Sequence, residues 1–387
     1  MAESVAGLRA PFPWFGGKTR AAPLIWERLG PVPNYVEPFA GALGCLLARP
    51  YAPGIETIND LDGFVANAWR AISLAPEATA QWADWPVSEC CLHARHLWLR
   101  ERRASLSARL MADPDYCDPK IAGWWLWGIS CWIGGGWCGA GSAGPWGVVD
   151  GHFVHLGNAG QGVQRQLPHL GDAGRGVKRL LPHLGTAGRG VTRKRPLLGG
   201  EGSGQGVKRL LPHLSDAGQG VIRQRPHLGG AGPAQGIHTQ GTSQDLRAYF
   251  QALSARLRRT RVCCGDWQRI MGESVTVCHG LTGILLDPPY SQEEGRDKDL
   301  YAEESATVAH DVREWCLANG HHPLLRIVLC GYGDVHDALL AQGWVKQPWK
   351  TNGGMGNQGQ GRGRANKARE MLWCSSACLL PVQGTLL

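Results

Sequence analysis

The sequence predicts an α/β fold in which a mostly parallel sheet carries helices on both faces and is interrupted by a central insertion. Three observations predict it. Residues 35–39 are a short apolar run typical of a buried strand, and residues 56–60 read as a second strand that ends in an acid. Gly283 to Leu286 is an apolar strand that ends in Asp287-Pro288-Pro289-Tyr290. Each is followed by a small-residue turn, an acid or prolines, as expected where a strand gives way to a loop.

Length and composition exclude several other classes. The 387 residues suffice for one large or two ordinary domains with a core that can bury an enzyme site. The 55 glycines and 24 prolines exclude an all-helical bundle. There is no apolar run of about 18 residues and no basic-then-apolar N-terminus, so we expect neither a membrane span nor a secretory signal. The 13 cysteines form no CxxC pair, which favours reduced cytosolic thiols over a disulfide scaffold.

The first predicted strand leads into a turn of small residues. Tyr35 to Phe39 is the strand, Ala40 to Gly44 the turn, and Cys45 to Ala48 the start of a helix. This arrangement lets a backbone approach a cofactor closely, although many strand–helix junctions use glycine only for packing. The second strand, Glu56 to Asp60, ends in an acid, which in doubly wound sheets commonly holds ribose hydroxyls. Together the two segments favour a cofactor site more strongly than either does alone.

Asp287-Pro288-Pro289-Tyr290 is the most specific pattern in the chain. Two successive prolines fix the backbone and lack N–H donors, so their carbonyl groups are free to accept hydrogen bonds. An acid and a free carbonyl make a pair of acceptors suited to a planar amino group, and the tyrosine offers a stacking face to the ring that bears it. A rigid turn that merely ends the strand is the alternative. The flanking acid and aromatic residue favour binding of an amine.

The C-terminal part is compatible with completion of the sheet. We expect strands at Leu325 to Cys330, Val345 to Trp349 and Glu370 to Trp373, and a short helix at Asp334 to Ala341. Between them, the glycine-rich segment Gly353 to Asn366 with its nearby cations is either a loop over a nucleic acid or a solvated connection.

Tryptophans gather between Gly123 and Trp146, namely Trp124, Trp125, Trp127, Trp132, Trp137 and Trp146. Exposed members could stack on nucleic-acid bases. Packing in a core is the favoured interpretation for most of them.

The excess positive charge is concentrated in the centre of the chain. Residues 151–241 contain twelve Lys and Arg against three acids, a local charge of +9, whereas the whole chain carries +8. A polyanionic partner is the natural explanation. A solvated basic insertion without a partner is the alternative.

The same segment is an internal repeat. The unit P-H-L-G-x-A-G-x-G-V-x-R recurs about every 14 residues, at Pro168, Pro182, Pro212 and Pro226, with a degenerate copy at Pro196. Its glycines favour turns, so we expect loops or short strand–turn units. One histidine per unit without a neighbouring cysteine or acid is a weak metal signal, and we expect no metal.

These patterns resemble the Dam-like DNA adenine-N6 methyltransferases, which use S-adenosylmethionine. Pro13-Trp14-Phe15-Gly16-Gly17-Lys18 is similar to the family's N-terminal cofactor motif, and Glu37 to Gly44 resembles its main cofactor motif, with Ala42 where a further glycine is common. Asn59-Asp60 resembles the acid after the second strand, Cys264-Gly265-Asp266-Trp267 the stretch whose acid contacts the cofactor's adenine, and Asp287 to Tyr290 the catalytic motif. The resemblance implies a Rossmann-like methyltransferase fold with a central target-recognition insertion that contains the repeat.

The resemblance also implies roles for the matching residues. Lys18 and the loop Phe39 to Gly44 would hold the methionine end of the cofactor, Asp60 its ribose or methionine end, and Asp266 its adenine amino group. Asp287 and the Pro288 carbonyl would accept hydrogen bonds from the N6 amine of an adenine flipped out of the duplex, on which Tyr290 would stack. The implied cofactor residues are Trp14, Gly17, Lys18, Glu37, Phe39, Gly41, Gly44, Asp60 and Asp266, and the implied catalytic residues are Asp287, Pro288, Pro289 and Tyr290.

The expected domain organisation follows the resemblance. Residues 11–75 and 260–380 form a discontinuous catalytic domain, residues 76–150 a helical, tryptophan-rich part of the target-recognition region, and residues 151–241 the basic insertion. We expect phosphate contacts from this insertion, or alternatively a protein partner or neutral expansion of the repeat. The expected DNA contacts are Arg175, Lys178, Arg179, Arg189, Arg193, Lys208, Arg209 and Arg223.

The expected activity is site-specific methylation of adenine N6 in double-stranded DNA. Related sites for cytosine N4 tend to carry serine in place of the leading acid, so Asp287 favours adenine. RNA adenine methylation and a catalytically inactive DNA-binding protein on the same scaffold stay open, as does a partner restriction endonuclease. We expect a cytoplasmic monomer in a bacterial or phage-infected cell.

Overall fold

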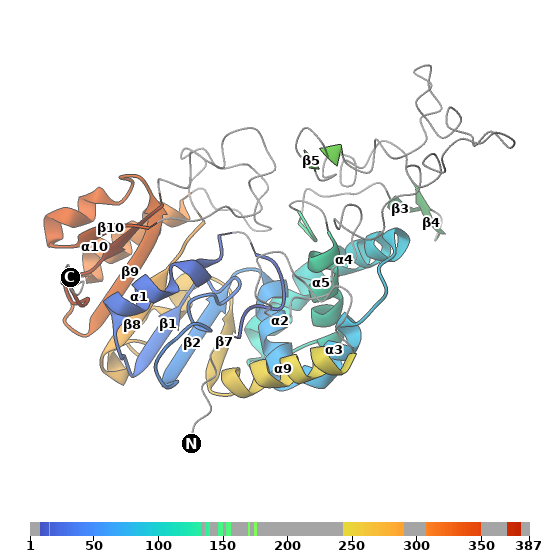
Figure 1. Ribbon diagram of the computed structural model, residues 1–387, viewed down its shortest axis with the longest axis horizontal. Coiled ribbons are helices and arrows are strands. Elements are labelled where there is room, and N and C mark those ends of the chain that lie inside the picture. Colours follow the sequence, from blue (N-terminus) through green and yellow to red (C-terminus); the bar gives the residue numbers. More distant parts are fainter. Residues whose placement is uncertain are drawn as a thin grey trace, which may run out of the picture.

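A computed structural model describes residues 8–14, 16–132, 136–139, 146–149, 152–155, 169–170, 174–175, 243–289, 307–349 and 370–380. Within them the chain has a mixed α/β fold built on one seven-stranded, mostly parallel sheet. Figure 1 shows this sheet in one half of the molecule and a group of helices beyond its β7 edge. The segment Gly353 to Asn366 and most of the repeat lie outside the described residues.

The sheet has the strand order β10-β11-β9-β8-β1-β2-β7. Five strands form a parallel array, and β11 runs antiparallel between β9 and β10. The six strands expected from the sequence are confirmed to within two residues at their ends. The strands are β1 (Asn34–Glu37), β2 (Ile55–Asp60), β7 (Thr260–Cys264), β8 (Thr282–Leu286), β9 (Leu325–Tyr332), β10 (Val345–Pro348) and β11 (Glu370–Cys374).

Helices cover both faces of the sheet. Tyr35 of β1 packs in the same buried cluster as α1 (Ala22–Leu29), whereas the next residue, Val36, belongs to the cluster that includes α10 (Val308–Asn319). Neighbouring strand residues point to opposite faces, so each central strand is buried on both sides. This explains why β8 is buried at every position and carries the apolar run Ile284 to Leu286 instead of an alternating pattern.

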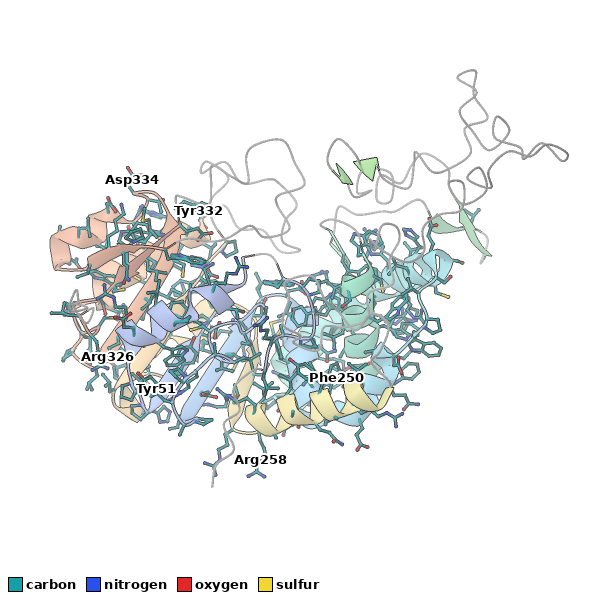
Figure 2. The ribbon with its side chains drawn as sticks, viewed as in Figure 1. Tyr51, Phe250, Arg258, Arg326, Tyr332 and Asp334 are labelled. Carbon is teal, nitrogen blue, oxygen red and sulfur yellow. The ribbon has the colours of Figure 1, made fainter. Side chains whose placement is uncertain are left out.

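The carboxyl ends of the parallel strands lie along one edge of the sheet. Figure 2 places Arg326, near the start of β9, and Tyr51, which precedes β2, at the lower edge. It places Tyr332, the last residue of β9, and Asp334 at the upper edge. The loops that follow β1, β2, β7 and β8 therefore converge on the upper edge.

The helical group packs against the β7 side of the sheet. Its tryptophans Trp125, Trp127 and Trp137 are buried, and Trp124 and Trp132 pack against the same core. The expectation of core packing is therefore confirmed for these five, while the Trp146 side chain lies outside the description. The helices are α2 (Gly63–Leu74), α3 (Pro76–Ala83), α4 (Glu89–Ala112), α5 (Pro119–Cys131) and α9 (Ser243–Leu257). No described helix is both long and apolar enough to cross a membrane.

Four short strands occur among the few residues that are described between the helices α5 and α9. β3 (Trp146–Val149) pairs with β4 (His152–His155), and β5 (His169–Leu170) pairs with β6 (Gly174–Arg175), both antiparallel. Only the β5–β6 pair falls on the 14-residue repeats.

The structure differs from two of the helices that the sequence predicts. The segment from Cys45 to Ala48 forms successive turns instead of a helix, because Leu43 has a φ of 51° and Pro50 disfavours helical backbone in the residue before it. The helix expected at Asp334 to Ala341 is a 3-10 helix, η7 (Asp337–Gln342), preceded by a turn. Gly343, at a φ of 81°, ends it in the left-handed conformation.

Candidate functional site

A cavity of about 190 Å³ opens at the carboxyl edge of the sheet. The loops that follow β1, β2, β7 and β8 line it, together with the segment before α1 and the first turn of α10. Polar, charged and aromatic side chains all contribute to its wall. The polar lining residues include Lys18, Glu37, Asn59, Asp60, Asp62, Asp266, Gln268, Asp287 and Asp311, and the aromatic ones are Trp14, Phe39 and Trp267.

All nine residues expected to bind a cofactor line this one cavity. Of the expected catalytic residues, Asp287 and Pro289 line it as well, Pro288 is buried, and Tyr290 lies outside the described residues. Among the expected DNA contacts, Arg175 is the last residue of β6, where only the backbone is described. The other seven lie outside the described residues.

Lys18 and Asp287 form an ion pair at the bottom of the site. The Lys18 Nζ lies 2.7 Å from the Asp287 Oδ1 and donates a second hydrogen bond, of 2.9 Å, to the Gly16 carbonyl. Burial would lower the pKa of Lys18, but the Asp287 carboxylate, helped by Cys330 and Glu370, outweighs burial and raises this pKa above its ordinary value. Lys18 is therefore a permanent cation that holds the Asp287 carboxyl group in place.

The loop after β1 is shaped by two glycines that leave no room for a side chain. Gly41 has a φ of 44°, and a Cβ there would lie 2.5 Å from the Trp14 Nε1. A Cβ on Gly44 would lie 2.6 Å from the backbone nitrogen of Thr19. The loop therefore packs directly on the segment that carries Trp14 and Lys18, which explains why glycine is needed at both positions.

The acid at the end of β2 organises this loop. Asp60 accepts hydrogen bonds of 2.9 Å from the backbone N–H groups of Gly41 and Asp62. Burial raises the pKa of Asp60, and the Gly41 bond opposes that rise. Its neighbour Asn59 donates to the carbonyls of Pro38 and Gly265, and so ties the ends of β1, β2 and β7 together.

Glu37 is a buried acid at the end of β1. Its Oε2 accepts a 3.0 Å hydrogen bond from the Tyr35 hydroxyl, which lies two residues earlier on the same face of the strand. Burial raises the pKa of Glu37 to about 8, and the nearby Asp287 adds to this rise. Near neutral pH this side of the cavity therefore holds a carboxyl group able to take up or release a proton.

An aromatic wall closes the β7 side of the cavity. The Phe39 and Trp267 rings lie 6.1 Å apart with their planes at 31°, and a planar ligand ring can pack beside them. Next to them the exposed Asp266 caps the 3-10 helix η4 (Trp267–Ile270) by accepting a 2.8 Å hydrogen bond from the Gln268 N–H.

The cavity wall carries more acids than bases although the chain as a whole is basic, even though Asp287 and Asp62 pair with Lys18 and Arg103 and burial raises the pKa of Glu37 and Asp60. Six carboxyl groups and a single Lys belong to the described residues that line it, in a chain of formal charge +8. Such a cavity favours a cationic ligand over an anionic one. No cluster of three His, Cys, Asp or Glu side chains suited to a metal ion occurs among the described residues.

Several lining residues were not expected from the sequence. Asp62 lies two residues after Asp60 and is the N-cap of α2, where its Oδ1 accepts a 2.9 Å hydrogen bond from the Phe64 N–H. An aspartate directly before a helix is the sequence signal that could have found it. Val308 and Asp311 come from α10, about twenty residues beyond the Asp-Pro-Pro-Tyr pattern, with no local signal that links them to the site.

In comparisons with known proteins, no family model and no curated protein sequence matches this chain.

Proposed function

We propose that this protein is an S-adenosylmethionine-dependent methyltransferase that acts on the N6 amine of adenine in double-stranded DNA. One observation carries the proposal. Sequence segments more than 200 residues apart, which resemble separate motifs of the same family, line a single cavity that contains both the expected cofactor residues and Asp287.

The strand order supports a nucleoside-containing ligand. Counted along the chain, β1, β2, β7, β8 and β9 are the first to fifth strands of the sheet, so its parallel part has the order 3-2-1-4-5. In Rossmann-like sheets of this order, ligands bind outside the carboxyl ends of the strands where the order reverses. That place is the boundary of β1 and β8, whose following loops carry Glu37 to Gly44 and Asp287.

The charge of the cavity favours S-adenosylmethionine over a dinucleotide. A dinucleotide pyrophosphate usually sits at the N-terminus of the helix after the first strand. In the described chain the residues after this loop form turns, and the exposed carboxyl groups of Asp266 and Asp311 on the cavity wall disfavour phosphates. S-adenosylmethionine instead carries a cationic sulfonium, and when bound it supplies an electrophilic methyl group.

The lining residues fit the parts of this cofactor. Lys18, Glu37 and the backbone of the loop 39–44 offer a cation, an acid and amide groups to the methionine end. Asp60 offers an acceptor to hydroxyl or amino groups, and Asp266 can accept from the adenine amine. Phe39 and Trp267 supply an apolar wall for the adenine ring.

Asp287 is the proposed acceptor for the target amine. The Asp287 carboxylate and the Pro288 carbonyl each accept one N–H of the adenine N6 amine, which increases the electron density on the nitrogen. Lys18 keeps that carboxylate in place through the ion pair between its Nζ and the Asp287 Oδ1. The amine nitrogen would form its bond to the methyl carbon as the carbon–sulfur bond breaks, so that the sulfonium would leave as a neutral thioether and one N–H proton would pass to the Asp287 carboxylate and on to solvent. Alignment of the reacting atoms would supply much of the acceleration.

The choice of DNA rests on the charge of the insertion. The +9 of residues 151–241 suits a phosphate backbone. RNA adenine methylation and an inactive DNA-binding scaffold are the competing functions, and a partner restriction endonuclease would be a separate matter.

Methyl transfer from labelled S-adenosylmethionine to unmodified duplex DNA, followed by nucleoside analysis, tests the proposal. We expect N6-methyladenine from the wild type and none from Asp287→Ala, which should still bind the cofactor. Arg102→Ala, on the exposed side of α4, is the matched control and should retain activity. Label in RNA alone would favour the RNA enzyme, and cofactor binding without any transfer would favour the inactive scaffold.

A further inference from the structure

Cys138 lies in a backbone conformation that residues other than glycine rarely adopt. Its φ is 57° and its side chain is fully buried. Two side chains of α4 hold it, since its N–H donates to the His96 Nδ1 at 3.2 Å and its carbonyl accepts from the Arg103 Nη2 at 2.9 Å. Such a conformation costs about 1–3 kcal/mol and persists only where the surroundings enforce it. The turn 136–139 is therefore held in one arrangement by α4.

Arg103 joins this turn to the wall of the cofactor cavity. Its Nη1 donates to the Asp62 Oδ1 at 3.3 Å while its Nη2 holds the Cys138 carbonyl. The same guanidinium lies 4.8 Å from the centre of the Phe64 ring, and its side chain is only 16% exposed. Asp62 lines the cavity and its N–H donates to Asp60. One planar group thus bridges the cavity wall and the strained turn.

A second contact ties the same turn to the cavity. The Trp137 Nε1 donates to the Trp125 carbonyl at 3.1 Å, and the Trp137 ring packs against Gly128. Trp125 in turn lies 6.3 Å from Trp14, which lines the cavity. The turn 136–139 is thus linked to two residues of the cavity wall, Asp62 through Arg103 and Trp14 through Trp125, and it precedes β3 and the basic segment in sequence.

We propose that Arg103 is a positioning residue that couples occupation of the cofactor cavity to the conformation of the turn 136–139, and thereby to the binding of nucleic acid. The inference rests on the proposed function. A cofactor that orders Asp60 and Asp62 also fixes the carboxylate to which Arg103 donates, so the guanidinium holds the Cys138 carbonyl more rigidly. By thermodynamic reciprocity, a duplex that needs the ordered turn strengthens cofactor binding by the same factor, which is typically about 5–150-fold.

Three variants isolate the contribution of Arg103. Arg103→Ala removes the hydrogen bonds to Asp62 and Cys138. Arg103→Lys keeps the charge and much of the apolar stem, but a single ammonium lacks the planar fork that holds two acceptors at once. Arg102→Ala is the matched control, because Arg102 is adjacent on α4 and its guanidinium lies 3.7 Å from the Trp98 ring, with a hydrogen bond to the Trp98 carbonyl.

The experiment combines amide hydrogen exchange at residues 136–139 with the Kd of S-adenosylhomocysteine, measured by calorimetry with and without unmethylated genomic DNA fragments. In the wild type and Arg102→Ala, we expect the ligand to slow exchange in the turn and the DNA to tighten ligand binding about tenfold. In Arg103→Ala and Arg103→Lys the ligand still binds without DNA, but both effects fall to near zero.

The outcomes separate the inference from the proposed function. If the ligand binds the wild type and exchange in the turn does not change, or if both Arg103 variants keep the wild-type coupling, the inference is overturned while the proposed cofactor stands. If S-adenosylhomocysteine does not bind the wild type at all, the proposed cofactor and the inference fail together. Should Arg103→Ala fail to fold, Arg103→Lys alone decides between retained and lost coupling.

Discussion

Replacing Lys18 by Met tests the part of the site on which the proposed chemistry depends. The substitution keeps an apolar side chain of similar length and removes the ammonium, so Asp287 loses its 2.7 Å partner and the Gly16 carbonyl loses a donor. The resulting loss of stability can be bounded from the structure. At 2.7 Å and an effective dielectric constant of about 20, the attraction is roughly 6 kcal/mol, most of which offsets the desolvation of the two charges.

The net contribution of the Lys18–Asp287 ion pair to stability depends on how far its two side chains are exposed to water. Breaking a fully buried pair costs about 3–5 kcal/mol, whereas exposed pairs contribute about 0–1 kcal/mol. The Lys18 side chain is 4% exposed, but the Asp287 side chain is 20% exposed, so in Lys18→Met water can solvate part of the Asp287 carboxylate. We therefore expect Lys18→Met to lower the free energy of unfolding by about 3 kcal/mol.

Urea denaturation of Lys18→Met, Asp287→Asn and the double variant measures this effect as a double-mutant cycle. We expect a coupling energy of about 2 kcal/mol, because the neutral pair no longer leaves a charge unpaired. The folded-state pKa of Lys18 lies above its ordinary value of 10.5, so its stabilising contribution is complete below that pH and is lost only at higher pH. The effect should thus be constant between about pH 6 and pH 9. A loss below about 0.5 kcal/mol with no coupling would refute the reasoning.

Three further predictions concern the loop, the buried acid and the insertion. Gly41→Ala should lower stability by about 1–3 kcal/mol and weaken cofactor binding, because its Cβ would overlap Trp14 at a positive φ, whereas Gly272→Ala, with open space around it, should be nearly neutral in the same melts. Burial raises the pKa of Glu37 from 4.5 to about 8, so the folded chain holds a proton that the unfolded chain releases, and the free energy of unfolding should fall as pH rises through this window. Glu37→Gln should flatten that fall in urea melts from pH 5 to pH 8, and an unchanged slope would contradict the assignment. If Lys208 and Arg209 contact phosphates, changing both to Gln should reduce the salt dependence of DNA binding by about two contacts, whereas an unchanged slope would place the duplex elsewhere.

Local patterns sufficed for most of the sheet. The strand β8 could be predicted because a strand buried on both faces is apolar at every position, and the Asp-Pro-Pro that follows it ends it sharply. The same local reasoning failed after β1, where apolar residues suggested a helix between Cys45 and Ala48. The left-handed Leu43 and the nearby Pro50 leave too few residues to nucleate one, so the segment forms turns.

Site residues could be predicted from the sequence only where they belong to a short pattern of consecutive residues. Gly41, Asp60 and Asp287 each belong to a short pattern at the end of a strand, and strand ends of a parallel array meet at one edge. Asp311 belongs to no such pattern, and it reaches the cavity because α10 begins beside the loop after β8.

By itself, the sequence determined six of the seven strands of the sheet, all but β7, together with where those strands end and which chemical groups follow them, because these properties depend on periodicity, proline and glycine over a few residues. Only the tertiary structure decided that the ammonium of Lys18 lies against Asp287, 269 positions later, that six carboxyl groups share one cavity in a basic chain, and that Arg103 spans Asp62 and Cys138. Those contacts depend on the order of strands in the sheet and on the packing of α4 beside it, which bring together residues whose separation in the chain carries no information about their distance in space.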